Sequence, residues 1–421
     1  MRKILLFALL IRLLFIFGRY HPDLGNHLDW GVKFWEYGPK RFYEQTIWGV
    51  SWPNQPPGTI YLWGLAAKLK EIIFGFFWWL NLNLKIFPSF IIPFFELRLH
   101  TALVKIPSVL AELGIGWLIY LIVKKLKNKK TAEKAGLIFL FNPITIYNSA
   151  IWGQTDGLVN FFGLLAIYFF FEKKPILAMF SFLLSFYIKG SLLIFFPVVI
   201  WFLIKDKYSL KTLLLSLFIP VMLIFLITLP FVSHNPVWKW IYDLYQVRVF
   251  GHQGNMLSGN AFNLWALIFG VDLSKTDNQK WLFFDFRSWG KTLFILAILP
   301  SLLNLFFSKT KNEKVFFSLA VISFAAFLFL TNMHERYLYP VFPYLAILVG
   351  FQAVPLWFYL VISCIHLLNL YNLWFYPEIP VLREFLSYQT YLPGRLMSFI
   401  LIFLFLRLYS FSLRPKSGKI A

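Results

Sequence analysis

Two aspartates, Asp23 and Asp29, stand six residues apart in the polar stretch from His21 to Gly58. Asn26 and His27 lie between them. A positioned carboxylate can act as a general base that deprotonates a hydroxyl nucleophile, and a second carboxylate can tune it or help to bind a metal ion. Acidic residues are also common in ordinary solvated loops, so these two alone do not decide between the two interpretations.

A second polar group is the sequence WGQTDG at residues 152–157, which contains Trp152, Gln154 and Asp156. Amides, acids and aromatic faces suit a sugar site, because hydroxyls take paired polar partners and the apolar face of the ring stacks on aromatic side chains. The simpler interpretation makes Asp156 the N-cap of the helix that follows. Capping does not exclude a binding role.

Lys189 lies in the apolar run YIKGSLLIFFP. A buried ammonium group in a membrane helix is costly, so we expect it to be functional and to have an anionic partner, for which a phosphate is a good candidate. The alternative is that the side chain extends to a membrane interface, which short helices would allow.

His334, Glu335 and Arg336 open the sequence HERYLYPVFP. Arginine suits bidentate recognition of phosphate, and the histidine could reach the same group or an acceptor. Glu335 could simply pair with Arg336 or cap the helix.

The composition predicts an all-α polytopic membrane protein. The 421 residues are 59% hydrophobic and 14% charged, with a mean hydropathy of +0.66, which is too apolar for a soluble globular protein. The net charge of +21 fits positively charged loops on the inner side and contact with anionic lipid better than nucleic acid. The single cysteine, Cys364, excludes an intrachain disulfide framework and a cysteine-based metal cluster.

The basic residues predict the topology, since they are retained on the inner side of the membrane. Residues Met1 to Gly18 resemble a signal peptide, but Arg12 interrupts the apolar run and no small-x-small cleavage site follows. We therefore expect a transmembrane anchor. The lysine-rich run at 124–130 marks the next inner loop.

Residues 19–100 then form a long first external segment, in which we expect two short interfacial helices at Thr59–Leu69 and Ile72–Leu84. Further external segments are predicted at 231–288 and 371–394. The whole chain is predicted as a single membrane domain, residues 1–421.

About twelve spans are predicted, some shorter than the roughly 20 residues that cross a bilayer unaided. A break between two short helices is expected around Lys189 and Gly190. Residues Ala135–Ala150 are expected to form one continuous span. Broken helices are tolerated where they line a protected cavity. The four polar groups all fall on the predicted external side.

The order of these motifs resembles that of the GT-C glycosyltransferases, integral membrane enzymes that take a sugar from a polyprenyl-phosphate donor and carry a catalytic aspartate in the first external loop. Asp23 followed by Trp30 looks like the Asp-x6-Trp signature of the dolichyl-phosphate-glucose glucosyltransferases. The segment NQPPGTIYLWG, which contains Gln55, looks like their YPPL-type segment.

The later motifs continue the resemblance. YIKGSLLIFFP is similar to the FKQMxLYxxP segment of these enzymes, and HERYLYPVFP to their HEKSILLPxxP segment, with Arg336 keeping the charge of the lysine. WGQTDG and HERYLYP together look closer to bacterial and archaeal relatives of the mannosyltransferase that adds the second mannose in GPI-anchor assembly.

The resemblance implies an inverting transfer of a hexose, with mannose favoured, to a glycan or glycolipid acceptor on the extracytoplasmic face. Lysine-rich inner loops suggest a prokaryotic plasma membrane. Asp23 and His334 are the expected catalytic residues. The expected substrate-binding residues are Asn26, His27, Asp29, Trp30, Gln55, Trp152, Gln154, Asp156, Lys189, Glu335 and Arg336.

No cofactor is expected. Asp23, His27 and Asp29 could together hold a divalent cation, although the resemblance does not require one.

A different class of function fits some of the same features. A polytopic transporter or flippase of a lipid-linked sugar or anion would also use an intramembrane charge such as Lys189. Against it, the two halves of the sequence show no inverted repeat, and the longest loops are external and aromatic. An oligosaccharyltransferase or protein O-mannosyltransferase is disfavoured, because no large soluble C-terminal segment is visible.

Overall fold

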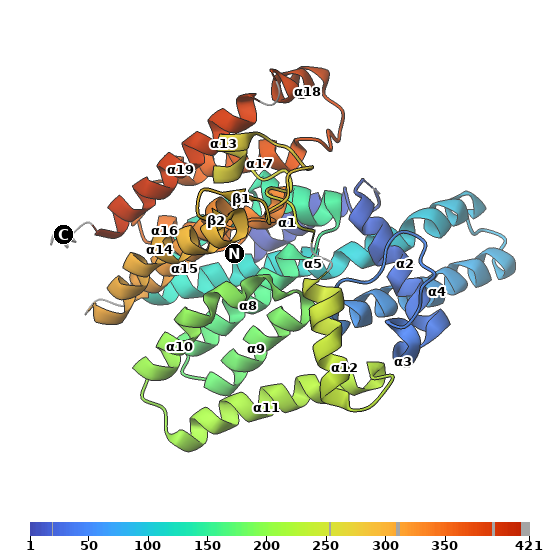
Figure 1. Ribbon diagram of the computed structural model, residues 1–421. Coiled ribbons are helices and arrows are strands. Elements are labelled where there is room, and N and C mark those ends of the chain that lie inside the picture. The colour runs from blue at the N-terminus through green and yellow to red at the C-terminus, as the bar shows by residue number, and fades with distance from the viewer. Residues whose placement is uncertain (19, 252–253, 309–311, 390–391, 414–421) are drawn as a thin grey trace. The chain divides into compact units, whose positions relative to one another are not determined.

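The computed structural model describes residues 1–18, 20–251, 254–308, 312–389 and 392–413. These residues are mostly helical, and their only sheet is a hairpin of two short strands (Figure 1). The chain divides into two compact units, each built from three separate segments. The first comprises Met1–Leu118, Thr145–Leu193 and Asp206–Gln253, and the second Ile119–Ile144, Ile194–Lys205 and Gly254–Ala421.

The elements of the first unit, including three that continue into the second (α5, α7 and η3), are α1 (Arg2–Leu13), α2 (Pro22–Tyr37), α3 (Pro39–Phe42), α4 (Pro57–Asn83), η1 (Ser89–Ile91), α5 (Ile92–Leu126), α7 (Pro143–Ile146), the π-helix η2 (Tyr147–Trp152), α8 (Asp156–Phe171), α9 (Pro175–Ile188), η3 (Gly190–Phe195), α11 (Leu210–Thr228), η4 (Leu229–Phe231), α12 (Val237–Asp243) and the π-helix η5 (Leu244–Phe250).

The elements of the second unit are α6 (Lys129–Leu140), α10 (Phe196–Lys205), α13 (Leu264–Phe269), β1 (Lys280–Trp281), β2 (Phe284–Asp285), α14 (Phe286–Phe307), α15 (Asn312–Phe329), η6 (Glu335–Leu338), α16 (Val341–Gly350), α17 (Leu356–Tyr371), α18 (Pro380–Ser387) and α19 (Leu392–Leu413).

The stretch after α1 is not the polar loop expected from the sequence, because residues Pro22–Tyr37 form the 16-residue helix α2. Pro22 occupies the first helical position, and His21 caps the helix by accepting the backbone N–H of Asp23 on Nδ1 at 3.2 Å. Proline at this position and a polar N-cap are both typical helix starts. Asp23 therefore lies in the first turn of a helix.

The prediction of two short helices at Thr59–Leu69 and Ile72–Leu84 is wrong, since α4 is one continuous helix of 27 residues. Lysine and glutamate, which occupy positions 70 and 71, are good helix formers, so nothing breaks the helix between the two predicted pieces. α4 lies beside the N-terminal part of α5, where the rings of Phe77 and Phe95 stack with centroids 4.2 Å apart (Figure 1).

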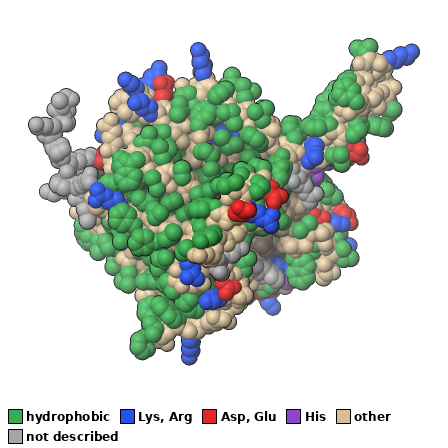
Figure 2. All heavy atoms as spheres, turned by 90° about the horizontal axis from the view of Figure 1, so that it is seen from above, with side chains coloured by type: hydrophobic (Ala, Val, Ile, Leu, Met, Phe, Trp, Pro, Cys, Tyr) green, Lys and Arg blue, Asp and Glu red, His purple; other side chains and the backbone are tan. Residues whose placement is uncertain are grey.

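The prediction of an all-α polytopic membrane protein is confirmed, but fewer helices are long enough to cross a membrane than the twelve expected. Five helical segments of the described chain qualify by length and hydropathy: Ser89–Leu126, Leu210–Phe231, Phe286–Phe307, Asn312–Phe329 and Leu392–Ser412. Four apolar helices are shorter: Asp156–Phe171, Pro175–Ile188, Gly190–Lys205 and Leu356–Tyr371. Hydrophobic side chains cover most of the face in Figure 2.

Breaks in the apolar helices explain the difference in number. The break expected at Lys189 and Gly190 is confirmed, since α9 ends at Ile188 and η3 begins at Gly190. The span expected at Ala135–Ala150 is instead a bent pair, Lys129–Leu140 and Pro143–Trp152, with a 46° bend. Proline lacks the N–H needed to continue a helix, so Pro143 starts a new one. The external sides assigned to 19–100, 231–288 and 371–394 stay predictions.

Packing within each unit follows apolar faces. In the first unit α2 packs on α4, and α9 packs on α8, α11 and α4. In the second unit α15 is the central helix, buried from Val315 to Leu328 and in contact with α14, α16 and α19. The pairs α8–α9 and α9–α11 bring Lys189, at the end of α9, beside the start of α8.

The contact between α2 and α4 generates a stability prediction. A Cβ atom on Gly31 would lie 2.5 Å from the backbone oxygen of Trp63, so Gly31→Ala should force the two helices apart and destabilise the protein by about 1–3 kcal/mol. Gly75 lies on α4, and a Cβ atom added there would meet nothing within 4 Å, so Gly75→Ala should stabilise the protein by up to about 1 kcal/mol. Thermal unfolding in detergent measures both. Equal midpoints for the two variants would contradict the close approach.

Candidate functional site

The Asp23 carboxylate is held at the start of α2 by residues from a distant part of the chain. Gln154 donates its Nε2 hydrogen to Asp23 Oδ2 at 2.9 Å, and the same nitrogen lies 3.3 Å from His21 Nδ1. His21 Nδ1 lies 3.7 Å from Asp23 Oδ2. The Asp23 side chain keeps 34% of its surface exposed. The carboxylate is therefore both oriented and accessible.

Asp156 and Lys189 form an ion pair beside this group. Lys189 Nζ donates to Asp156 Oδ1 at 3.1 Å, with side chains only 15% and 7% exposed, respectively. Asn148 Nδ2 approaches the other carboxylate oxygen at 3.5 Å. Asp156 is thus the anionic partner expected for Lys189. It is the first residue of α8 and Thr155 is the N-cap, so the alternative that made Asp156 the N-cap is wrong by one position.

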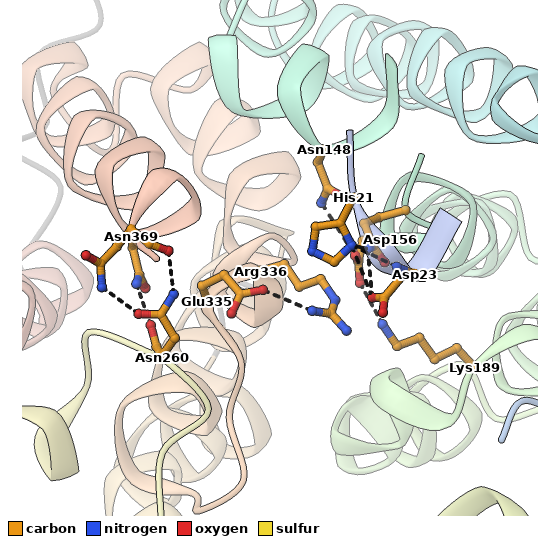
Figure 3. A network of polar contacts seen from close by, with 11 residues as sticks. His21, Asp23, Asn148, Asp156, Lys189, Asn260, Glu335, Arg336 and Asn369 are labelled. Carbon is orange, nitrogen blue, oxygen red and sulfur yellow. Dashed lines mark hydrogen bonds and ion pairs between the residues drawn. The ribbon is translucent and has the colours of Figure 1, made fainter. Parts of the chain in front are cut away.

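These side chains converge from separate elements (Figure 3). His21 and Asp23 come from the start of α2, Asn148 from the π-helix η2, and Asp156 from the start of α8. The segment between η2 and α8 turns at Gly153, whose φ of 77° lies in the left-handed region. Such a backbone favours glycine. A glycine is also needed sterically there, because an added Cβ would lie 3.0 Å from Leu24 and 3.2 Å from Lys105.

Trp152, at the end of η2, is buried and packs its ring against His21 with centroids 4.5 Å apart. Two predicted residues of the WGQTDG motif, Gln154 and Asp156, therefore lie in the polar network, and the third supports His21. Their predicted roles in binding sugar or acceptor stay predictions.

Other predicted residues near Asp23 make contacts that hold the neighbouring chain. Asn26 Oδ1 accepts a hydrogen bond from Ser51 at 2.8 Å, and Asp29 Oδ2 accepts the backbone N–H of Gly49 at 2.9 Å. Trp30 Nε1 donates to the Ser51 carbonyl at 2.8 Å. These contacts fix the 49–51 segment on α2. A role for these three side chains in binding substrate stays a prediction.

His27 and Gln55 make contacts with other parts of the first unit. The buried ring of His27 stacks on Trp63, with centroids 4.5 Å apart. The backbone carbonyl of Gln55 accepts a hydrogen bond from the Tyr43 hydroxyl at 2.8 Å. In the part of the chain that the structure describes, no group of three or more His, Cys, Asp or Glu residues could hold a metal ion. Asp23, His27 and Asp29 therefore do not form the cation site considered from the sequence.

The group at 334–336 belongs to the second unit. Arg336 Nη1 pairs with Glu335 Oε1 at 3.0 Å, the simpler of the two interpretations of Glu335. His334 precedes η6, and its backbone forms isolated bridges with Gly259 and Asn260. The predicted functions of His334, Glu335 and Arg336 stay predictions.

A cluster of buried amides supports this segment (Figure 3). Asn372 Nδ2 donates to Asn260 Oδ1 at 2.6 Å, and Asn369 Nδ2 donates to the Asn260 carbonyl at 2.6 Å. Asn369 Oδ1 also accepts the backbone N–H of Phe262. The cluster fixes Asn260 beside the backbone of His334.

Sequence reasoning missed several polar residues of the first unit, namely His21 and Asn148 in the network itself and Lys105 and Glu112 behind it. Arg12 served only as an argument against a signal peptide. A signal was present for the charged ones, since Arg12, Lys105 and Glu112 stand within apolar segments, where ionisable residues are rarely tolerated without a purpose.

The fold can be compared with solved structures. ArnT from Cupriavidus metallidurans, bound to undecaprenyl phosphate, matches with a TM-score of 0.50 and 13% sequence identity over 97% of this chain and 75% of that one. The chain has the GT-C fold. The apo structure of the same ArnT matches similarly, with a TM-score of 0.50 and 13% identity over 96% and 74% of the two chains.

Two sequence comparisons add to this. A family model described as GPI transamidase subunit PIG-U matches residues 74–268, which is less than half of the chain. The match includes Gln154, Asp156 and Lys189 but neither Asp23 nor His334. No curated protein matches the sequence. The GT-C fold and membrane character are therefore shown, whereas the closer relation to a mannosyltransferase is not.

The Asp156–Lys189 ion pair gives a prediction that does not depend on activity. Asp156→Asn and Lys189→Met should each destabilise the protein, because each leaves a buried charge without its partner. The double variant should lose less unfolding free energy than the two single variants lose together, and the difference, the coupling energy, should be about 1–3 kcal/mol. Denaturant unfolding in detergent measures all three variants.

The exposed pair Lys33–Glu36 on α2 is a matched control. Its coupling should stay near about 0.3–0.5 kcal/mol, as is usual for solvated pairs one helical turn apart. A coupling at Asp156–Lys189 no larger than that of the control would refute the buried ion pair.

Proposed function

We propose that the protein is an inverting glycosyltransferase that moves a hexose from a polyprenyl-phosphate donor to a glycan or glycolipid acceptor. Mannose is the favoured sugar, on the resemblance of WGQTDG and HERYLYP. The reaction takes place on the extracytoplasmic face. The observation that carries the proposal is the oriented, partly exposed carboxylate of Asp23 next to the Asp156–Lys189 ion pair in an apolar helical protein.

The proposed reaction needs one base and no covalent intermediate. The acceptor hydroxyl oxygen attacks the anomeric carbon, the bond from that carbon to the donor phosphate oxygen breaks, and its electron pair leaves with the phosphate. Asp23 takes the proton of the hydroxyl. Attack on the face opposite the leaving group inverts the anomeric configuration.

Gln154 acts on Asp23 rather than on the sugar in this scheme. Its hydrogen bond to Oδ2 fixes the carboxylate plane, so that the base meets the hydroxyl in a defined direction. A general base must lie within hydrogen-bond reach of the proton that it abstracts, and orientation is part of that requirement.

Lys189 supplies the positive charge for the leaving group. An ammonium group has three N–H donors, and one of them points to Asp156 Oδ1. A fixed cation stabilises the charge that develops on the departing phosphate, and such stabilisation is among the largest contributions to catalysis. Asp156 then holds the ammonium in position between reactions. Arg336 keeps its predicted role in phosphate recognition as part of the proposal.

The fold likeness is compatible with this chemistry. ArnT has been crystallised with undecaprenyl phosphate, which is itself a polyprenyl phosphate. We take the same class of lipid as the donor carrier here.

The match to the PIG-U model favours a second candidate, a GT-C-fold subunit of a larger membrane assembly that transfers no sugar itself. In that case the polar network would be structural or would bind a lipid headgroup. The two candidates differ in what the isolated protein can do, since only the first requires turnover by the purified chain.

The experiment is sugar transfer by purified protein in liposomes, from radiolabelled polyprenyl-phosphate-mannose or polyprenyl-phosphate-glucose into a lipid extract. The wild type should transfer one of the two sugars. Asp23→Asn should lose about 10²–10⁴-fold in kcat, because general base catalysis contributes about that much. Glu36→Gln, an exposed carboxylate on the same helix paired with Lys33, should keep its activity.

Three results would count against the proposal. Transfer that persists in Asp23→Asn would remove Asp23 as the base. A folded wild type that transfers neither sugar would favour the subunit candidate. Movement of the donor across the bilayer without transfer would favour the transporter.

A further inference from the structure

Lys105 is a fully buried lysine in the middle of α5, with 0% of its surface exposed. Its Nζ donates to three backbone carbonyls, those of Gly18 at 2.7 Å, Ala150 at 2.8 Å and Ile151 at 2.7 Å. An ammonium group has three N–H donors, so these contacts use all of them. The stem of the side chain is also confined, since Gly153 lies against its Cγ and Cε.

The three carbonyls belong to the two segments that carry the proposed site. Gly18 ends the segment after α1 that leads directly to His21 and Asp23. Ala150 and Ile151 lie in η2, the π-helix that leads to Gln154 and Asp156. One ammonium group therefore joins two parts of the chain more than 120 residues apart.

A second buried contact holds the same π-helix about two turns further along α5. Glu112 Oε2 accepts a hydrogen bond from Ser149 Oγ at 2.7 Å and pairs with Arg12 Nε at 2.9 Å. Arg12 Nη2 donates to Thr145 Oγ1 at 2.9 Å, which adds an anchor at the preceding turn. Lys105 and Glu112 are seven residues apart, so they lie on one face of α5.

The free-energy cost of burying the charged side chains of Lys105, Glu112 and Arg12 indicates a purpose beyond packing. A charged side chain within an apolar helix is expensive unless it is fully satisfied, and a plain apolar contact would stabilise a helix pair as well or better. The π-helix is also an irregular element whose carbonyls are not all satisfied by the regular α-helical pattern, so an external donor fixes its shape.

We propose that Lys105, supported by Glu112, is a positioning residue of the site, because its ammonium group sets the Asp23 segment against the Gln154–Asp156 segment. The inference rests on the proposed function for its effect on turnover. The geometric part, that Lys105 fixes the distance between the two segments, stands independently of it.

The test combines a distance measurement with kinetics. Spin labels at Val32→Cys on α2 and Leu177→Cys on α9, in a Cys364→Ser background, report on the two sides of the site, because both positions are exposed and α9 packs on α8. Lys105→Met should broaden or shift the distance distribution. Lys211→Met, which changes an exposed lysine on α11, should leave the distribution unchanged.

In the transfer assay Lys105→Met should lower kcat about 100-fold, because a small misplacement of reacting groups costs about that much. The KM for the donor should change little, since Lys105 contacts backbone and not substrate in the proposal. A loss confined to KM would overturn the positioning role.

Chemical rescue separates the ammonium group from the side chain that carries it. In Lys105→Ala, propylammonium should narrow the distance distribution again and recover part of kcat. Tetramethylammonium, which has the charge but no N–H donor, should do neither. Equal effects of the two ions would overturn the proposal.

Ser149→Ala serves if the Lys105 variants do not fold. It removes the contacts of Ser149 Oγ with Glu112 Oε2 and with the Thr145 carbonyl, and it should broaden the same distribution by a smaller amount. An unchanged distribution in Lys105→Met, or in Ser149→Ala where the former cannot be purified, refutes the inference. If the wild type transfers no sugar, the proposed function fails while the distance data still decide the positioning role.

Discussion

Charged groups inside apolar helices must find their partners within the protein, and the polar architecture of the first unit follows from that constraint. Lys105 donates hydrogen bonds to three backbone carbonyls, Arg12 pairs with Glu112, and Lys189 pairs with Asp156. Each pairing joins elements that are distant in the sequence. The helices of this unit are therefore held by a few polar contacts of defined direction in addition to their close apolar packing.

The same constraint explains what could be predicted from the sequence. The break at Lys189 and the need for an anionic partner both followed from one lysine in an apolar run, and the structure supplies Asp156. The partner itself could not be predicted, because it depends on how α8 and α9 pack. Lys105 carried the same signal as Lys189, but its three acceptors are backbone carbonyls, which no side-chain pattern reveals.

The errors have local causes. The polar stretch after α1 was predicted as a loop because its side chains are polar, although a proline such as Pro22 is typical of a helix start. The break at Pro143 was missed because the apolar run continues through it. Apolar composition predicts membrane character well, whereas the direction of each helix depends on single residues such as proline and glycine.

Fold and function remain separate questions in this protein. A fold does not determine the chemistry of its site, and a likeness at 13% identity describes the path of the chain. The site residues must therefore carry the functional argument. The proposed function therefore rests on the arrangement of Asp23, Gln154, Asp156 and Lys189.

The π-helix at Tyr147–Trp152 has a consequence for how the sequence can change. A π-helical turn can be regarded as an α-helix with one inserted residue, and such insertions are frequent at functional sites. Deleting one residue there would give a more regular helix, yet it would rotate everything that follows by about 100°. Gln154 would then turn away from Asp23. The register of the site is thus set by the length of this one segment. A shorter and more regular helix would lose the contact between Gln154 and Asp23.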